Sequence, residues 1–410
     1  MQATDDLPLL RLTLALSLGA AVSLGVTRFA YGLLLPPMRA DLGWSYTLAG
    51  AMNTANALGY LLGALVTPRL MRSLGPARLL LGGALLSSVF MGLSGFFTDA
   101  AMLLAQRVLA GVASAFLFIA GGLLAARLGA LQSARSGLLL GLYYGGTGFG
   151  IVLSALAVPA VLGAAQGVAH GWQWAWWVLA LACVVATIVL AWPARVLGAL
   201  HDAAASQPTR EGSQFRWRVF TAGLAGYALF GVGYIGYMTF VIALLREQGV
   251  APSGVTLFYS LLGLAVLASS RIWAGVLDRY KGGQALAILN GVLGFATIVP
   301  ALTHAWPLAI ASGLVFGGVF LSVVASTTAL VRHNLPPAQW AAGISAFTIV
   351  FAAGQIVGPT IVGYIADGPG GLARGLVFSA VAIWTGALLA WRQKPLDAGG
   401  GALTSASLRP

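Results

Sequence analysis

Residues 194–217, ARVLGALHDAAASQPTREGSQFRW, form the one long polar interruption in an otherwise strongly apolar chain. Apolar runs of about 20 residues or more, long enough to cross a bilayer as helices, recur on both sides of it. Six precede the interruption and six follow it. The twelve predicted spans are 10–38, 46–67, 77–97, 100–126, 136–163, 172–193, 218–245, 253–277, 283–303, 305–331, 341–366 and 372–392. The sequence therefore predicts an all-α integral membrane protein with two six-helix bundles.

Composition supports this class and excludes others. Of 410 residues, 59% are hydrophobic and 8% are charged, whereas about 25% of residues are charged in a soluble domain. The single cysteine, Cys183, excludes an internal disulfide and a thiolate metal cluster. The formal charge of +12 does not indicate nucleic-acid binding, because the basic residues lie in short loops between spans. We expect no metal and no cofactor.

Loop charges predict the orientation of the chain. The predicted parts are an N-terminal bundle (1–193), a central loop (194–217), a C-terminal bundle (218–392) and a tail (393–410). Most of the 22 basic residues fall on the side that carries both termini and the central loop. Only Arg39, Arg246 and Arg374 fall in loops on the other side. Because basic loops stay inside, we expect both termini, the central loop and the tail to be cytoplasmic.

Three arginines, Arg28, Arg107 and Arg271, lie within predicted spans. The ten acidic residues and four histidines all lie at span ends, in loops or in tails. A charge at membrane depth is costly and therefore usually faces a cavity or a partner. A guanidinium donates paired hydrogen bonds to carboxylates or phosphates and stays charged at physiological pH. This pattern predicts a site that attracts anions.

Short motifs occupy corresponding places in the two halves. Met71-Arg72-Ser-Leu-Gly75 follows span two, and Asp278-Arg279-Tyr-Lys-Gly282 follows span eight. The other motifs are Arg107 with Gly111 in span four, Gly354-Gln355-Ile-Val-Gly358-Pro359 in span eleven, Thr27-Arg28-Phe29-Ala-Tyr31, Asn56-Ala-Leu-Gly59-Tyr60 and Gly233-Tyr234-Ile-Gly-Tyr237. With these motifs, essentially the whole chain resembles the major facilitator superfamily, and in particular its bacterial YbfB/YjiJ-type branch.

The resemblance implies that spans one, four, seven and ten line a cavity, while spans two, five, eight and eleven form gates. It also implies a cytoplasmic gate after span eight. In the copy of this motif after span two, Met71 stands where the superfamily has an acidic residue. Arg271 precedes Asp278 by seven residues, so it either pairs with that carboxylate or extends toward the inner surface. The expected gating residues are Arg72, Gly75, Arg271, Asp278, Arg279, Gly282, Gly358 and Pro359.

The expected binding residues lie at similar depths. A rise of about 1.5 Å per residue puts Arg28 and Arg107 in the outer-to-middle membrane, near Asn53 and Asn56. Two interpretations stay open for each arginine. Arg107 either contacts substrate or does structural or coupling work, and Arg28 either contacts a substrate or anion or bonds helix carbonyls. The expected substrate-binding residues are Arg28, Arg107, Tyr31, Asn53, Asn56, Tyr234 and Gln355.

The leading function is secondary transport of a small organic anion by alternating access. No Gly-x-x-x-x-Gly-Lys loop for nucleotide phosphates is present. Because no acidic residue lies at mid-membrane, coupling is expected through exchange or through a proton carried by the substrate. The alternatives are proton-coupled efflux of amphipathic drugs or metabolites and, from another class, a non-transporting receptor or scaffold.

No enzyme is expected, because Gly146-x-Gly148-x-Gly150 does not have the dinucleotide-binding spacing and lies inside a span. The expected partners are a small-molecule substrate, the lipid bilayer and protons, with no nucleic acid. The chain is expected to be a monomer in the bacterial cytoplasmic (inner) membrane.

Overall fold

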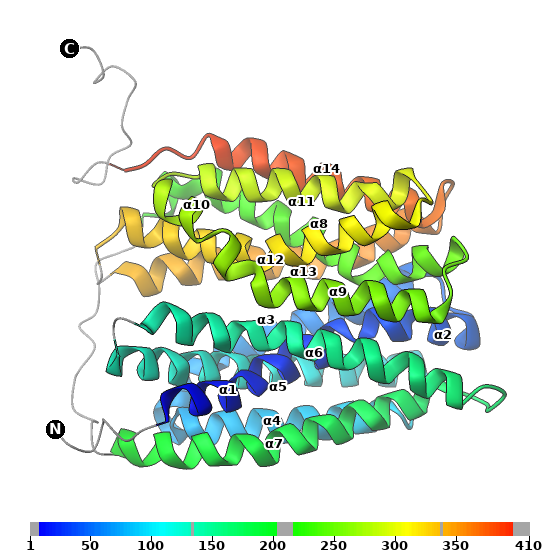
Figure 1. Cartoon of the computed structure of the whole chain (residues 1–410), viewed down its shortest axis with the longest axis horizontal. Helices are drawn as coiled ribbons and strands as arrows, with labels where there is room; N and C mark the ends of the chain where they lie inside the picture. The colour runs from blue at the N-terminus through cyan, green and yellow to red at the C-terminus, as the bar shows by residue number, and fades with distance from the viewer. Residues whose placement is uncertain (1–7, 133–134, 203–215, 337–338, 397–410) are drawn as a thin grey trace.

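The computed structural model describes residues 8–132, 135–202, 216–336 and 339–396, and the elements of these segments are helices (Figure 1). The first half holds α1 (Leu9–Ala20), η2 (Ala21–Phe29), α2 (Tyr31–Leu42), α3 (Tyr46–Leu74), α4 (Pro76–Ser94), α5 (Ala100–Leu131), α6 (Ser136–Ala164) and α7 (Trp172–Asp202). The second half holds η4 (Trp217–Phe220), α8 (Thr221–Glu247), α9 (Pro252–Ile272), α10 (Ala274–Arg279), α11 (Gln284–Leu302), α12 (Trp306–Asn334), α13 (Trp340–Ala366) and α14 (Gly371–Trp391).

These helices confirm the predicted fold class. The elements α1, η2 and α2 together form the first span, and most predicted limits agree with helix ends within a few residues. By length and hydropathy, 11 helices in the described segments are able to cross a membrane. The remaining long helix, α3, has 29 residues and carries Asn53, Asn56 and Arg69 along its length, which lowers its hydropathy. It completes the set of twelve.

Some predicted limits differ from the structure. Helix α7 continues through Asp202, into the segment predicted as the central loop, because residues 194–202 contain no helix-breaking proline. Helix α9 ends at Ile272 rather than near residue 277, and Trp273 separates it from α10. The predicted tail begins with packed residues: Gln393 is buried and its amide nitrogen donates to Val219 O. The rest of the central loop (203–215) and of the tail (397–410) lies outside the described residues.

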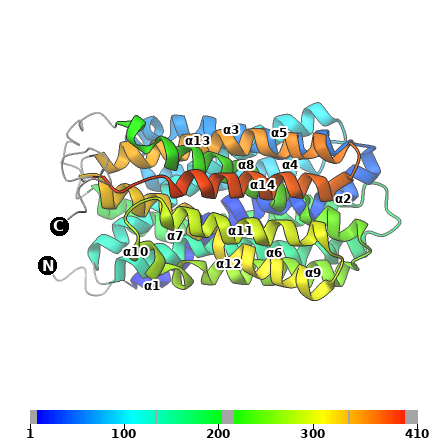
Figure 2. The ribbon, with the colours of Figure 1, turned by 90° about the horizontal axis from the view of Figure 1, so that it is seen from above.

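The two halves lie side by side (Figures 1 and 2). Helix α1 begins and α14 ends at the same end of the molecule, which we call the terminal end; the opposite end is the far end. Between the halves, α3 packs along α13, α6 packs along α9, and α2 contacts α8. These contacts join spans two and eleven and spans five and eight, the pairs expected to form the gates.

Glycine allows several of these helices to touch at their backbones. A Cβ on Gly146 would lie 1.9 Å from Ser17 O of α1, and one on Gly148 would lie 2.4 Å from Gly263 O of α9. A Cβ on Gly50 would lie 2.2 Å from Pro359 O, at the α3–α13 contact. The glycine run of α6 therefore serves close helix packing, as expected for small residues in membrane helices.

Several hydrogen bonds join described residues of the two halves at mid-depth and at the far end. Tyr259 donates to Phe29 O at 2.8 Å, and Thr54 donates to Ile356 O at 2.6 Å. At the far end itself, the amide nitrogens of Tyr46 and Thr47 bond the carboxylate oxygens of Asp367 at 2.7 and 2.8 Å. The halves are therefore closed against each other at the far end.

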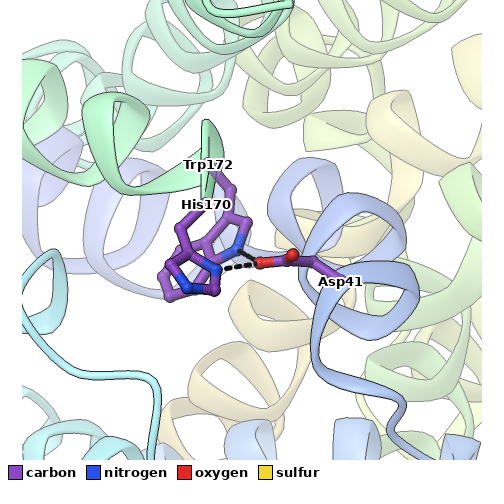
Figure 3. A network of polar contacts seen from close by, with 3 residues as sticks. All are labelled: Asp41, His170 and Trp172. Atoms are coloured by element: carbon purple, nitrogen blue, oxygen red, sulfur yellow. Dashed lines mark hydrogen bonds and ion pairs between the residues drawn. The ribbon is translucent and has the colours of Figure 1, made fainter. Parts of the chain in front are cut away.

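A polar contact also fixes the far end of the first half (Figure 3). Trp172 Nε1 donates to Asp41 Oδ2 at 2.5 Å, and His170 Nδ1 lies 2.6 Å from the same oxygen. Asp41 belongs to the last turn of α2, whereas Trp172 begins α7. The contact ties the loop before α7 to the end of the first span.

Candidate functional site

Arg107 lies inside the first half, and three protein oxygens accept hydrogen bonds from it. Its side chain is 2% exposed, and its guanidinium donates to Thr27 O at 2.7 Å, to Asn53 Oδ1 at 3.1 Å and to Met52 O at 3.4 Å. The carbon at the centre of the guanidinium also lies 5.2 Å from the centroid of the Tyr31 ring. Arg107 thus links η2, α3 and α5, which corresponds to the structural interpretation left open by the sequence.

The neighbours that the sequence placed beside Arg107 are present around it. Asn56 donates to the backbone oxygen of Arg107 at 3.2 Å, and the Tyr31 hydroxyl donates to Ala49 O at 2.8 Å. The Asn53 amide accepts from Arg107 and donates across the halves to Thr239 Oγ1 at 2.8 Å. The predicted polar cluster therefore forms, and protein partners already occupy its main donors.

Arg28 has a contrasting environment. It is 3% exposed, yet its guanidinium makes no hydrogen bond with any described residue, and Nε is buried without a partner. It belongs to η2, a π-helical stretch of the first span in which Thr27 Oγ1 bonds Val22 O at 2.7 Å. Such stretches often occur at functional sites. A buried cation without an acceptor is unfavourable, so an anion beside Arg28 would be stabilised.

Polar groups from both halves surround Arg28. Its guanidinium carbon lies 5.5 Å from the Tyr60 ring centroid. The Tyr234 hydroxyl donates to Gln355 Oε1 at 2.9 Å. This bond joins the two binding residues predicted in the second half. The amide nitrogen of Gln355 and the Tyr60 hydroxyl donate to no described residue, so both are available to a ligand.

Aromatic rings form an apolar wall on the side of the second half. Tyr234 stacks on Phe230 at 4.8 Å, on Phe351 at 5.4 Å and on Phe320 at 5.8 Å between ring centroids. Phe29, next to Arg28, meets Phe320 edge to face at 5.8 Å. A guanidinium beside such a wall is suited to a ligand with one charged group and one apolar part.

Four of the predicted gating residues are charged and lie at the terminal end. At the terminal end, the side chains of Arg72, Arg271, Asp278 and Arg279 are exposed. No ion pair between Arg271 and Asp278 is found among the described residues, because the break at Trp273 ends the helical phase that would align them. Their roles in gating stay predictions.

The predicted gating glycines and proline lie at turns and close helix contacts. Gly75 has φ +78° at the end of α3, a backbone conformation that favours glycine. A Cβ on Gly282 would lie 2.7 Å from Gln393 O, and one on Gly358 would lie 2.4 Å from Val232 O. Pro359 contacts Gly50 across the halves. Their roles in gating also stay predictions.

Sequence reasoning missed two parts of the site. Thr239 and Phe320 contact the first half, but a threonine and a phenylalanine in apolar helices carry no signal of their own. Asp367 was seen only as an acidic residue at a span end, and its bonds to α3 depend on a contact between residues 320 positions apart.

The fold and the cross-half site define a membrane transporter built from two six-helix halves. A family model described as "Uncharacterised MFS-type transporter YbfB" matches residues 20–391. The chain belongs to this family of the major facilitator superfamily, which confirms the resemblance seen in the sequence.

Other known proteins are similar to this chain in sequence or in fold. A chloramphenicol resistance protein of Streptomyces lividans is 26% identical over 379 residues, which cover 89% of this chain and 92% of that protein. The nucleoside transporter NupG has a TM-score of 0.69 at 12% identity, over 95% of this chain and 100% of its own. A bacterial homologue of the human lysosomal transporter Spinster has a TM-score of 0.62 at 16% identity, over 95% and 97%.

Proposed function

We propose that this chain is a secondary transporter of small organic anions that carry an apolar, preferably aromatic, part. The observation that carries the proposal is Arg28, a buried guanidinium without a hydrogen-bond acceptor among the described residues. A carboxylate would accept two parallel hydrogen bonds from it and remove the cost of the unpaired charge.

The surroundings of Arg28 support a ligand that has both a charged group and an apolar part. Tyr60 and Gln355 offer further donors to the carboxylate, and the stack around Tyr234 offers a flat apolar surface to the rest of the ligand. The site draws its residues from η2 and α3 of one half and from α8 and α13 of the other. A ligand held there would contact both halves. Its binding would therefore change the relative stability of the two conformations in which the halves are closed at one end or the other.

The same geometry supports transport by alternating access. The halves are closed at the far end, and the gate residues of the terminal end are exposed. With the orientation predicted from the loop charges, the terminal end is cytoplasmic and this state admits substrate from the inside. Coupling is proposed to be carried by the substrate, either through exchange of one anion for another or through a proton bound to it.

Efflux of amphipathic compounds is the second candidate. The similarity to a chloramphenicol resistance protein favours it, together with the aromatic stack of α8, α12 and α13. Under this proposal, the aromatic wall dominates recognition and Arg28 contributes little. The two candidates therefore differ in whether the charge of the ligand decides its binding.

A matched panel of compounds separates the candidates. Purified protein in liposomes is tested for counterflow with aromatic and aliphatic carboxylates, each beside its neutral amide and its cationic amine of the same shape. The anion proposal predicts exchange of carboxylates and not of their amides or amines. Exchange that follows apolar surface regardless of charge, with chloramphenicol among the substrates, would favour the efflux proposal instead.

A further inference from the structure

The amino end of α3 is held by a carboxylate from the opposite half of the protein. Asp367 follows α13 directly and accepts three hydrogen bonds from the first turn of α3. The donors are the Tyr46 amide at 2.7 Å, the Thr47 amide at 2.8 Å and the Thr47 hydroxyl at 2.6 Å. The residue that precedes α3 in the chain, Ser45, accepts only from the Leu48 amide, at 3.1 Å.

The contact matches what a helix start requires. The first amide groups of a helix have no acceptor inside the helix, and the helix dipole favours a negative charge at this end. Ordinarily a residue just before the helix satisfies them. Here Asp367, on the other half of the molecule, accepts from two of them, so these bonds exist only while the halves meet at the far end.

Backbone geometry brings the two helices close enough for this contact. A Cβ on Gly363 would lie 2.2 Å from Tyr46 O, so only glycine allows α13 to approach the start of α3 as closely as it does. A second carboxylate acts beside it: the Tyr46 hydroxyl donates to Glu247, at the end of α8. Arg39 of α2 lies over the Tyr46 ring, 3.7 Å from its centroid.

We propose that Asp367, with Glu247 beside it, is the gate that closes the far end during transport. Both carboxylates belong to the second half and both bond the first turn of α3 in the first half. Moving the halves apart at this end breaks all of these bonds at once and leaves the start of α3 without acceptors. The gate therefore stabilises the state closed at the far end and is released when the halves rock.

The Asp367 carboxylate of the gate stays charged near neutral pH. The charged and titratable groups around Asp367 are Arg39, Tyr46 and Glu247, with Arg374 at the start of α14 donating to Pro369 O. Burial alone would raise the pKa of Asp367, but the bonds from Thr47 and Tyr46 together hold it below its usual value. Its carboxylate is therefore charged near neutral pH whether the gate is closed or open, and protonation of Asp367 is not what releases the gate.

Distances between spin labels on the two halves test this proposal without any substrate. Labels are attached to Thr98→Cys and His304→Cys, in exposed loops of the first and second halves at the far end, in a Cys183→Ala background. The variants Asp367→Ala and Asp367→Asn are compared with Asp99→Asn. Asp99 caps the start of α5 at the same end, accepting from the Met102 amide at 3.0 Å, but within one half.

Asp367→Ala is expected to raise the ratio of far-end-open to far-end-closed molecules at least about tenfold, which corresponds to about 1.4 kcal/mol. Asp367→Asn keeps the shape and an amide oxygen but loses the charge, so it is expected to open the gate less than Asp367→Ala. Asp99→Asn is expected to leave the distances unchanged. Unaltered distances in both folded Asp367 variants, or equal opening by Asp99→Asn, would overturn the proposal. Because no ligand is present, failure of the anion hypothesis would not affect this result.

Discussion

Replacement of Arg107 by methionine is expected to destabilise the protein, whereas the same change at Arg28 is not. Both substitutions remove one buried positive charge from neighbouring helices and leave a side chain of similar length. They differ in what is lost: Arg107 donates to three oxygens in its own half, and Arg28 donates to none among the described residues. The comparison therefore isolates the hydrogen bonds from the charge.

The magnitude follows from those bonds. A hydrogen bond to a charged group contributes about 1.5–3 kcal/mol, and a buried acceptor left without a partner costs about 1–3 kcal/mol. The bonds to Thr27 O and Asn53 Oδ1 are short enough to count fully, while the one to Met52 O at 3.4 Å is weak. Removing the buried charge offsets part of the loss. We expect a net destabilisation of about 2–4 kcal/mol for Arg107→Met.

Thermal unfolding of the purified variants in detergent measures this difference. A loss of this size is expected to lower the melting temperature by about 5 °C or more. Arg28→Met is expected to keep the parent value or exceed it, because an unpaired buried charge is removed. A lower melting temperature for Arg28→Met than for Arg107→Met would refute the assignment of a structural role to Arg107 and a ligand role to Arg28.

Three more outcomes are expected. Gly50→Ala should disfavour the far-end-closed state, because its Cβ would lie 2.2 Å from Pro359 O; unchanged label distances across the far end would count against the helix contact. Because the pKa of Asp367 is lowered in the closed state, its stabilisation is complete above the usual carboxyl pKa and lost only as the pH falls through the lowered value. Label distances should therefore stay constant between about pH 5 and 8. Reporter fusions in the central loop and at the C-terminus should both report cytoplasm, and a periplasmic signal would contradict the orientation.

The sequence was sufficient to predict the twelve spans because each span is a long apolar run and membrane helices satisfy their own backbone groups. It was less informative at helix ends. Helix α7 continues through Asp202 because a helix does not have to end at the membrane boundary. The break at Trp273 gave no sequence signal, since no proline or glycine stands there.

The binding residues could be predicted only in part. Arg28 and Arg107 were identified because a charge inside an apolar span is conspicuous, but their different environments depend on three-dimensional contacts. Arg107 meets oxygens from two other helices, whereas Arg28 donates to no described residue. The bond between Tyr234 and Gln355, and the aromatic wall beside it, arise from packing between α8, α12 and α13 that periodicity alone does not specify.

The most direct test of the account is the affinity of purified Arg28 variants for the best carboxylate found in the counterflow panel. Lysine keeps the charge but loses the paired donors, and methionine removes both. Affinity is expected to fall for Arg28→Lys and to fall further, by at least about tenfold, for Arg28→Met. If Arg28→Met is well folded and binds the same carboxylate as tightly as the parent, Arg28 does not hold the substrate and the proposed anion site is wrong.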